Sequence, residues 1–250
     1  MGHIGAGEKE AWDDMLEARF IPRALKELYK KLFPSYTDRI KEELVGEHLN
    51  FILDLGCGKS SPIKSSSRNF YTVGIDLFGQ YLLESKKRKT HNEYILGDVR
   101  KLCFQPKSFD AVLGIDLLEY ISKSRGRKLI KAMEKIAKRK VVIFTTNGFI
   151  PQREYNGNVF QVHRSGWTVN EFKQLGYNVK EINGLWFLRG ERAMPKFKQK
   201  LLNILFSDLT QKITLHYPEY AFALLCVKNF KKKPKLLKPR QKIATKQNHN

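Results

Sequence analysis

Two glycines that directly follow an apolar run are the first residues that could do chemistry. Residues 51–63 read FILDLGCGKSSPI, so Gly56 and Gly58 come right after the run. Glycines at such a turn allow backbone N–H groups to approach a bound ligand closely. The next apolar run ends at Asp76, where a carboxylate can accept hydrogen bonds from ribose hydroxyls. The pattern predicts a site for a nucleotide or a nucleoside.

Three ligand classes compete for this glycine loop. A P-loop, GxxxxGK[ST], requires a glycine where the sequence has Leu53, so the P-loop is excluded. A dinucleotide loop, GxGxxG, requires a third glycine where the sequence has Ser61, so NAD or FAD is the weaker alternative. A nucleoside without a pyrophosphate needs only the first two glycines. An adenosine that carries a sulfonium group fits this requirement.

Candidate acid–base groups lie in two other segments. Asp116, Glu119 and Tyr120 follow the fourth apolar run, and His163 lies in the segment FQVHRSGW. Histidine suits general-base catalysis because its pKa lies near neutrality. The alternative is that His163 only forms hydrogen bonds within its own loop. The same loop offers three further candidates, Arg153, Tyr155 and Gln161.

Short apolar runs alternate with longer amphipathic segments over residues 48–147, which predicts βαβ units and a parallel sheet. Polar residues at the carboxyl ends of such strands form the ligand sites of open α/β sheets. We expect an α/β fold with a Rossmann-like, seven-stranded, mostly parallel sheet, helices on both faces and a helical insertion before the last strand. The expected strands are 50–55, 71–76, 93–98, 109–116, 141–147, 177–185 and 220–228.

Two segments carry the apolar stripe of a helix that covers a sheet. Residues 124–138 place their apolar side chains on one face and Lys and Arg on the other. Residues 8–33 have a similar stripe, so N-terminal helices are expected over the edge of the sheet. The stripes consist of Leu129, Ile130, Met133, Ile136 and Ala137 in the first segment and of Phe20, Ile21, Leu25, Leu28 and Leu32 in the second.

Two further helices are expected after the fifth strand. Thr168 and Glu171 have the spacing of a capping box, and Gly176 is expected to end the helix that they begin. The insertion, residues 189–218, contains a basic amphipathic helix in which apolar residues recur every fourth position. Core packing or a subunit contact is its default role, and docking on a membrane surface is the alternative. The recurring residues are Phe197, Leu201, Leu205 and Leu209.

Four signatures occur in a characteristic order along the chain. They are ILDLGCG (52–58), GID (74–76), ILGDVRKLCF (95–104) and FDAVLGIDLLEYI (109–121). Together they resemble the class I S-adenosylmethionine-dependent methyltransferases, of the type 11-like group, over about residues 51–147. The resemblance implies an enzyme with S-adenosylmethionine as its cofactor. The third glycine that is usual in the family's loop is Ser60 here.

The resemblance also implies roles for individual residues. The methionine part of the cofactor would be surrounded by Asp54, Gly56, Cys57 and Gly58. The ribose hydroxyls would meet Asp76, and the adenine would meet Asp98 and Val99. Leu77 is a further residue expected to bind the cofactor. Asp116 would lie near the methionine amino group or the acceptor, and the catalytic candidates are Asp116, Glu119, Tyr120 and His163.

A metal-dependent variant of the chemistry is the weaker alternative. Residues 116–120, DLLEY, with the downstream His163, resemble the ExxEH motif and later histidine of the metal-dependent small-RNA 2′-O-methyltransferases. The histidine of that motif is Tyr120 here, so one ligand is lost. Asp116, Glu119 and His163 could still hold an ion on one face. We assign no metal to the chain.

The charge of the chain is strongly basic and unevenly placed. In the 250 residues, 46 Lys and Arg against 25 Asp and Glu give a formal net charge of +21. Residues 228–250 contain eight Lys, one Arg and no acidic residue, so +9 lies there and +12 elsewhere. A Lys-rich and Pro-rich run of this kind predicts a disordered basic tail. We expect weak contact of this tail and the insertion helix with RNA or an anionic membrane surface.

Composition and cysteine usage restrict the class of protein further. With 42% apolar and 12% aromatic residues the chain can form a full core, which excludes disordered and disulfide-stapled classes. Cys57, Cys103 and Cys226 are expected to be buried free thiols in a reducing compartment. Neither a signal peptide nor a transmembrane segment is recognisable, so a cytoplasmic location is expected. We expect an N-terminal helical segment (1–46), the methyltransferase domain (47–229) and the tail (230–250).

The acceptor is the least determined part of the expected function. A small-molecule or lipid-like acceptor, methylated on oxygen, is favoured because the loop and the insertion offer many aromatic residues and few polar ones. RNA methylation is the alternative that the basic charge favours. A non-catalytic nucleotide-binding protein on the same fold is a further alternative. The acceptor is expected to enter near Arg153, Arg164, Arg189 and Arg192.

Overall fold

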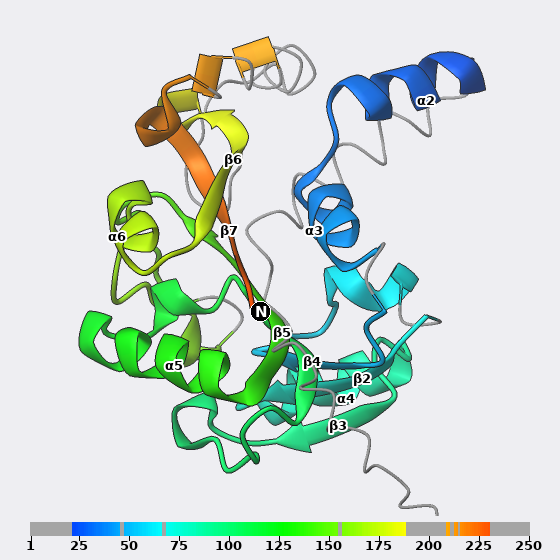
Figure 1. The fold of residues 1–250 in the computed structure, drawn as a ribbon, viewed down its shortest axis with the longest axis vertical. Coiled ribbons are helices and arrows are strands. Elements are labelled where there is room, and N and C mark those ends of the chain that lie inside the picture. The colour runs from blue at the N-terminus through cyan, green and yellow to red at the C-terminus, as the bar shows by residue number, and fades with distance from the viewer. Residues whose placement is uncertain are drawn as a thin grey trace, which may run out of the picture.

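A seven-stranded sheet forms the centre of the computed structural model (Figure 1). The structure describes residues 22–45, 48–66, 69–154, 157–188, 209–210, 213–214 and 216–230. The strands are β1 (Phe51–Leu55), β2 (Tyr71–Asp76), β3 (Glu93–Leu96), β4 (Phe109–Ile115), β5 (Ala137–Thr146), β6 (Asn178–Leu185) and β7 (Ala221–Asn229).

The strand order is β3-β2-β1-β4-β5-β7-β6. Strands β1 to β5 are parallel, and β7 pairs antiparallel with both β5 and β6. This arrangement confirms the predicted Rossmann-like, mostly parallel sheet. All seven predicted strands exist with small shifts at their ends, the largest being the start of β5, which begins at Ala137 rather than at Val141. Ala137 therefore opens a strand instead of closing the preceding helix.

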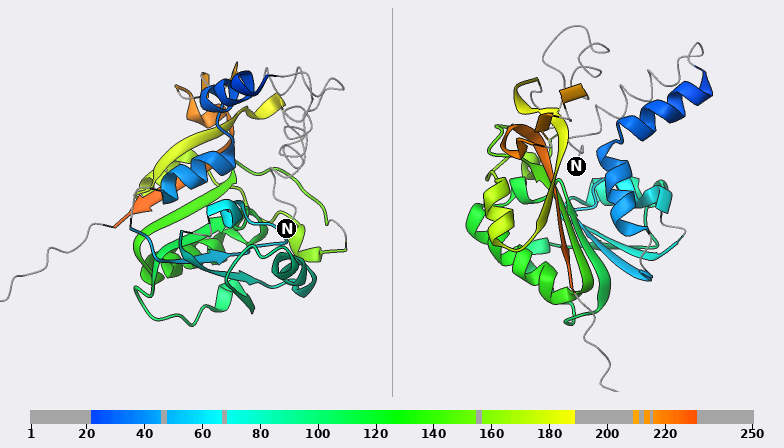
Figure 2. Two further views of the ribbon diagram at one scale, coloured as in Figure 1. Left: turned by 90° about the vertical axis from the view of Figure 1, so that its right-hand side faces the viewer. Right: turned by 45° about the horizontal axis from the view of Figure 1, so that its top comes forward.

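Helices cover both faces of the sheet (Figure 2). On one face lie α5 (Lys123–Ile136) and α6 (Val169–Gln174), and their apolar side chains join a core with β4 and β5. The other face is covered by α3 (Tyr36–Leu44), which packs on β1, β4 and β5. Helix α4 (Gly79–Lys87) contacts β2 and β3. The stripe predicted for residues 124–138 is confirmed, since its members are buried.

Capping boxes begin two of these helices. Thr168 accepts a hydrogen bond from the backbone N–H of Glu171, and the Glu171 side chain accepts from the backbone N–H of Thr168, as predicted. Gly176 follows α6 with a φ of +81°, a left-handed conformation that favours glycine. Ser35 and Asp38 form a second box at the start of α3, which the sequence analysis did not identify.

The apolar stripe near the N-terminus does not cover the sheet. Helix α2 (Arg23–Leu32) exists, but Leu25, Leu28 and Leu32 are all more than half exposed. Tyr36, Ile40 and Leu44 of α3 occupy the sheet face instead, because they recur at four-residue spacing in the shorter helix that follows. The rest of the predicted N-terminal stripe, most of the insertion with its amphipathic helix, and residues 231–250 lie outside the described residues.

The three cysteines are free, but only two are buried. Cys57 and Cys226 lie in the interior, where burial raises the pKa of both thiols. Cys103 is exposed, so the prediction of three buried thiols is wrong for this residue. It follows β3 in an open connection rather than on a buried strand. Within the described ranges, none of the helices is both long and apolar enough to cross a membrane.

Candidate active site

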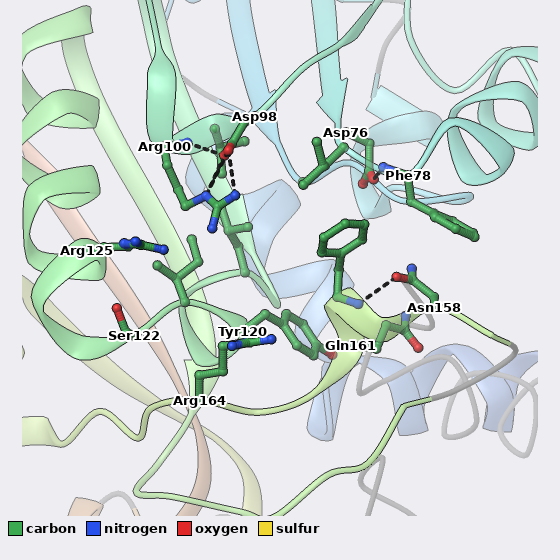
Figure 3. Close-up of a pocket in the computed structure, with 16 residues that line it drawn as sticks. Asp76, Phe78, Asp98, Arg100, Tyr120, Ser122, Arg125, Asn158, Gln161 and Arg164 are labelled. Carbon is green, nitrogen blue, oxygen red and sulfur yellow. Dashed lines mark hydrogen bonds and ion pairs between the residues drawn. The ribbon is translucent and has the colours of Figure 1, made fainter.

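A cavity opens beyond the carboxyl ends of β1, β2 and β4, where open α/β sheets place their ligands (Figure 3). Six residues from the predicted site line it: Gly56, Asp76, Leu77, Asp98, Val99 and Tyr120. Six others, Asp54, Cys57, Gly58, Asp116, Glu119 and His163, lie behind this lining. The topology therefore brings the predicted residues to one region of the fold, but only half of them line the cavity.

The glycine loop is held against the end of β2 by hydrogen bonds. The backbone N–H of Gly58 donates to Oδ2 of Asp76 at 2.9 Å, and that of Phe78 donates to Oδ1 at 2.8 Å. Gly56 and Gly58 have φ values of +67° and +58°, so both need the left-handed conformation. Asp76 is buried. Each of its oxygens has one of these two bonds, which leaves a lone pair on each for a ligand.

Asp54 lies below this loop, on β1, and it contacts a residue that the sequence analysis missed. Its Oδ2 atom accepts a hydrogen bond from Ser61 Oγ at 2.6 Å and lies 2.9 Å from Nε2 of His91. Nδ1 of His91 lies 2.9 Å from the hydroxyl of Thr90. Both Asp54 and His91 are buried. Asp54 thus supports the loop from inside and is not exposed in the cavity.

Cys57 contributes its backbone rather than its side chain. The N–H of Cys57 donates to the carbonyl oxygen of Ile75 at 3.0 Å, which ties the loop to β2. Its sulfur lies next to Gly74 of β2, since a Cβ atom added to that glycine would be 2.9 Å from the sulfur. Gly74 leaves the room that the Cys57 and His91 side chains fill.

Asp98 is paired across the cavity wall with Arg100. The guanidinium donates to both oxygens of Asp98, with Nη2 at 2.6 Å from Oδ2 and Nε at 2.8 Å from Oδ1. This hydrogen bonding lowers the pKa of the Asp98 carboxyl. In the same lining, Val99 is buried and Leu77 is exposed. The surface expected to meet an adenine is therefore apolar, with a charged pair at its edge.

Two carboxyl groups are buried behind the cavity. Asp116 directly follows β4 and has a φ of +48°, and its N–H donates to the carbonyl oxygen of Phe144 at 2.9 Å. Glu119 accepts a hydrogen bond from Thr145 Oγ1 at 2.9 Å. Burial, and then the charge of Asp116, raise the pKa of the Glu119 carboxyl well above its ordinary value. Glu119 therefore favours the protonated form.

Tyr120 and His163 connect this buried layer to the cavity. Their rings meet edge to face with centroids 5.0 Å apart, and the Tyr120 hydroxyl accepts a hydrogen bond from Gln152. Nδ1 of His163 lies 2.6 Å from the carbonyl oxygen of Ile150, so this nitrogen carries the proton. Burial is the main cause that raises the pKa of the Tyr120 hydroxyl well above its ordinary value. Of the predicted catalytic residues only Tyr120 lines the cavity.

The opposite wall of the cavity consists mostly of residues that the sequence analysis did not single out. Of the loop candidates, Gln161 lines the cavity, Arg153 is exposed outside it, and Tyr155 lies outside the described residues, as do Arg189 and Arg192. No local motif marks the remainder of the lining, because it is assembled from the segments that follow β2, β4 and β5 and from the first turn of α5. Arg164, near which the acceptor is expected to enter, does line the cavity. The other lining residues are Phe78, Leu117, Ile121, Ser122, Arg125, Asn158 and Phe160.

Metal coordination finds no support in the part of the chain that the structure describes. There, no group of three or more His, Cys, Asp and Glu is arranged to hold an ion. His163 has its Nδ1 atom on the Ile150 carbonyl and faces the Tyr120 ring.

Comparison with known proteins agrees with the fold. Residues 53–145 match a family model described as a methyltransferase domain. An 18S rRNA (guanine-N(7))-methyltransferase of Bos taurus is 33% identical over 84 residues, which are 33% of this chain and 30% of that protein. The chain thus spans less than a third of this relative. An uncharacterized protein of Methanocaldococcus jannaschii is 23% identical over 185 residues, covering 66% of this chain and 80% of its own length.

Solved structures share the fold at low sequence identity. An S-adenosylmethionine-dependent methyltransferase from Mesorhizobium loti has a TM-score of 0.52 and 17% identity, covering 80% of this chain and 100% of that one. A second, from Clostridium acetobutylicum, has a TM-score of 0.51 and 13% identity, covering 82% and 96%. The solved structures thus agree with the fold, and the family match likens residues 53–145 to a methyltransferase domain.

Proposed function

We propose that the cavity holds S-adenosylmethionine along the ends of β1, β2 and β3. Gly56 leaves room for the methionine part of the cofactor, and Asp76 accepts hydrogen bonds from the ribose hydroxyls. The adenine contacts Asp98, Val99 and Leu77. The fit rests on the remaining lone pairs of Asp76 and on the missing side chain at Gly56. Asp54, Cys57 and Gly58 would act by holding the loop, and Asp116 by shaping the end of β4.

We further propose that the acceptor is a small molecule that is methylated on an acidic oxygen. When bound, S-adenosylmethionine supplies a methyl group on a sulfonium sulfur. The acceptor oxygen forms the new bond to the methyl carbon, the carbon–sulfur bond breaks, and its electron pair stays on the sulfur. Alignment of these three atoms is the main task of the protein.

The observation that carries this proposal is the chemistry of the cavity wall. Among the described residues that line it, Asp76 and Asp98 are the only carboxylates and no histidine is present. Tyr120 keeps its proton because its pKa is raised, so its hydroxyl is able to donate a hydrogen bond to a ligand and is not available as a base. An oxygen that has already lost its proton to water needs no base at the methyl group. Carboxylic acids and acidic phenols meet this condition, and lipid-like acids are included.

The role of His163 as a general base stays a prediction from the sequence. In this structure His163 reaches the cavity only through the ring of Tyr120. We propose that it positions Tyr120, together with Gln152. Glu119 supports the same segment, since its carbonyl oxygen accepts hydrogen bonds from the N–H groups of Arg164 and Ser165.

Transfer of a labelled methyl group tests the proposal. The protein is incubated with methyl-labelled S-adenosylmethionine and a cell extract, and the extract is separated into organic, nuclease-sensitive and protease-sensitive fractions. We expect label in the organic fraction, released by mild alkali if it is a methyl ester. Failure of calorimetry to detect binding of S-adenosylmethionine at millimolar concentration would reject the assigned cofactor site.

RNA is the second candidate acceptor. The bovine relative is named for methylation of 18S rRNA, and it matches this chain over 84 residues. The surplus of positive charge also suits an electrostatic contact with phosphates. Label that enters only the nuclease-sensitive fraction would support RNA and reject the small-molecule acceptor.

A further inference from the structure

One side of the cavity has positive charge that the cofactor does not need. Arg125 lies in the first turn of α5, and Arg164 lies in the loop after β5; both line the cavity. Figure 3 shows their guanidinium groups on the side away from Asp76. S-adenosylmethionine carries a sulfonium and an ammonium group, and carboxylates are the side chains that stabilise such positive charges. Two arginines beside it therefore point to a different ligand group.

The two arginines have no acidic partner in the described part of the chain, unlike their neighbours. Arg100 is paired with Asp98, and Arg127 lies 3.4 Å from Glu171. No ion pair or side-chain hydrogen bond joins Arg125 or Arg164 to another described residue. A guanidinium offers five N–H donors in a planar fork that suits carboxylate and phosphate oxygens.

The backbone fixes both arginines at the cavity. The N–H of Arg164 donates to the carbonyl oxygen of Glu119 at 2.7 Å, which holds it against the segment that follows β4. Arg125 is held by α5, whose Leu129 and Met133 are buried in the core. Only the side chains must move to bind a ligand, so little backbone ordering opposes binding.

The start of α5 adds to the same site. Ser122 precedes the helix, lines the cavity between the two arginines, and its side chain makes no capping hydrogen bond. The first turn of α5 contains no acidic residue. The partial positive charge of the helix terminus is thus not neutralised locally, and it adds to that of the guanidinium groups.

We propose that Arg125 and Arg164 bind an anionic group of the methyl acceptor, a carboxylate or a phosphate monoester, at a distance from the oxygen that is methylated. The exposed ring of Phe160, which lines the same cavity, covers an apolar part of the same molecule. The acceptor is thus an amphipathic small anion. This inference rests on the proposed function, because it assumes that the cofactor occupies the Asp76 and Asp98 side of the cavity.

Calorimetry on the full chain loaded with S-adenosylhomocysteine tests the inference. The probes are phenylphosphate and phenylacetate, with benzyl alcohol as the neutral analogue and a diuridine monophosphate dinucleotide as the nucleic-acid analogue. We expect at least one small anion to bind, and benzyl alcohol to bind much more weakly. Arg125→Gln and Arg164→Gln should each weaken anion binding about tenfold, as loss of a charge-assisted hydrogen bond does.

Arg127→Gln is the matched control, because it lies on the same helix but faces Glu171. It should leave anion binding within twofold of wild type. The inference is overturned if neither small anion binds, if Arg127→Gln weakens binding as much as the other variants, or if the dinucleotide binds more tightly than both small anions. An equal loss of S-adenosylhomocysteine affinity in the Arg125 and Arg164 variants also overturns it, because the arginines would then serve the cofactor.

The same measurements separate this inference from the proposed function. Wild-type protein that binds S-adenosylhomocysteine but neither small anion rejects the anion site and leaves the cofactor site standing. Wild-type protein that fails to bind S-adenosylhomocysteine rejects both.

Discussion

Nε2 of His91 lies 2.9 Å from Oδ2 of Asp54, although 37 residues separate them in the chain. Both side chains are almost fully buried, at 0% and 2% exposure. A carboxylate oxygen only accepts hydrogen bonds, so Nε2 carries a proton. The pair anchors the strand that leads into the glycine loop to the segment before β3.

Substitution of His91 by alanine should strongly destabilise the protein. Removal of the imidazole breaks a buried pair and leaves the Asp54 carboxyl with its hydrogen bond from Ser61, and loss of one partner of a buried pair costs about 3–5 kcal/mol. Denaturation in urea measures the free energy of unfolding. Arg39→Ala is the control, since its pair with Glu42 is solvent-exposed and should contribute less than about 1 kcal/mol. A loss for His91→Ala no larger than that of the control would show that the buried pair is unimportant.

Substitution of Asp76 by asparagine should weaken cofactor binding more than folding. The amide loses the charge and one acceptor oxygen, so we expect at least about a tenfold rise in the Kd for S-adenosylmethionine. Asp110→Asn is the matched control. Asp110 also accepts from two backbone N–H groups, those of Asn50 and Phe51, but at the amino ends of the strands. It should lower stability and leave the Kd unchanged, and an equal Kd for both variants would reject the ribose assignment.

Glu119 should make the protein less stable as the pH rises. The pKa of Glu119 is about 4.5 in the unfolded chain and is raised well above that in the folded protein. At a pH between these two pKa values, the folded protein therefore binds more protons than the unfolded chain. The free energy of unfolding therefore falls through this window, by up to about 1.4 kcal/mol per pH unit. Glu119→Gln should remove this dependence and be more stable than wild type at pH 7, with the advantage vanishing below pH 4.5. Parallel stability curves for the two proteins would contradict a protonated Glu119.

His163→Ala should lower turnover with little effect on cofactor affinity. Loss of the ring leaves Tyr120 without its edge-to-face partner, and we expect at least about a tenfold fall in kcat on the acceptor found in the labelling experiment. Tyr120→Phe distinguishes the two roles of His163. If His163 acts only by positioning Tyr120, its substitution should have no further effect in the Tyr120→Phe background. Full activity of His163→Ala would remove it from the catalytic machinery.

Local sequence patterns predict the sheet and the cofactor side of the cavity. Strand β2 ends at Asp76 as predicted, and the capping box at Thr168 forms as predicted. Gly56 and Gly58 both adopt the left-handed conformation that a glycine loop needs. These features depend on residues within a few positions of one another, so the order of amino acids determines them.

The acceptor side of the cavity and the layering of the site depend on tertiary structure. Nothing near His91 in the sequence marks Asp54 as its partner, and nothing joins Arg125 to Arg164 except the packing of α5 beside the loop after β5. Glu119 and His163 have suitable side chains for catalysis, but the fold buries them behind Tyr120. The sequence by itself determined the chemistry that is available and the strands that carry it. Which groups reach the ligand, and which are desolvated, is set by long-range packing, because burial depends on segments that lie far apart along the chain.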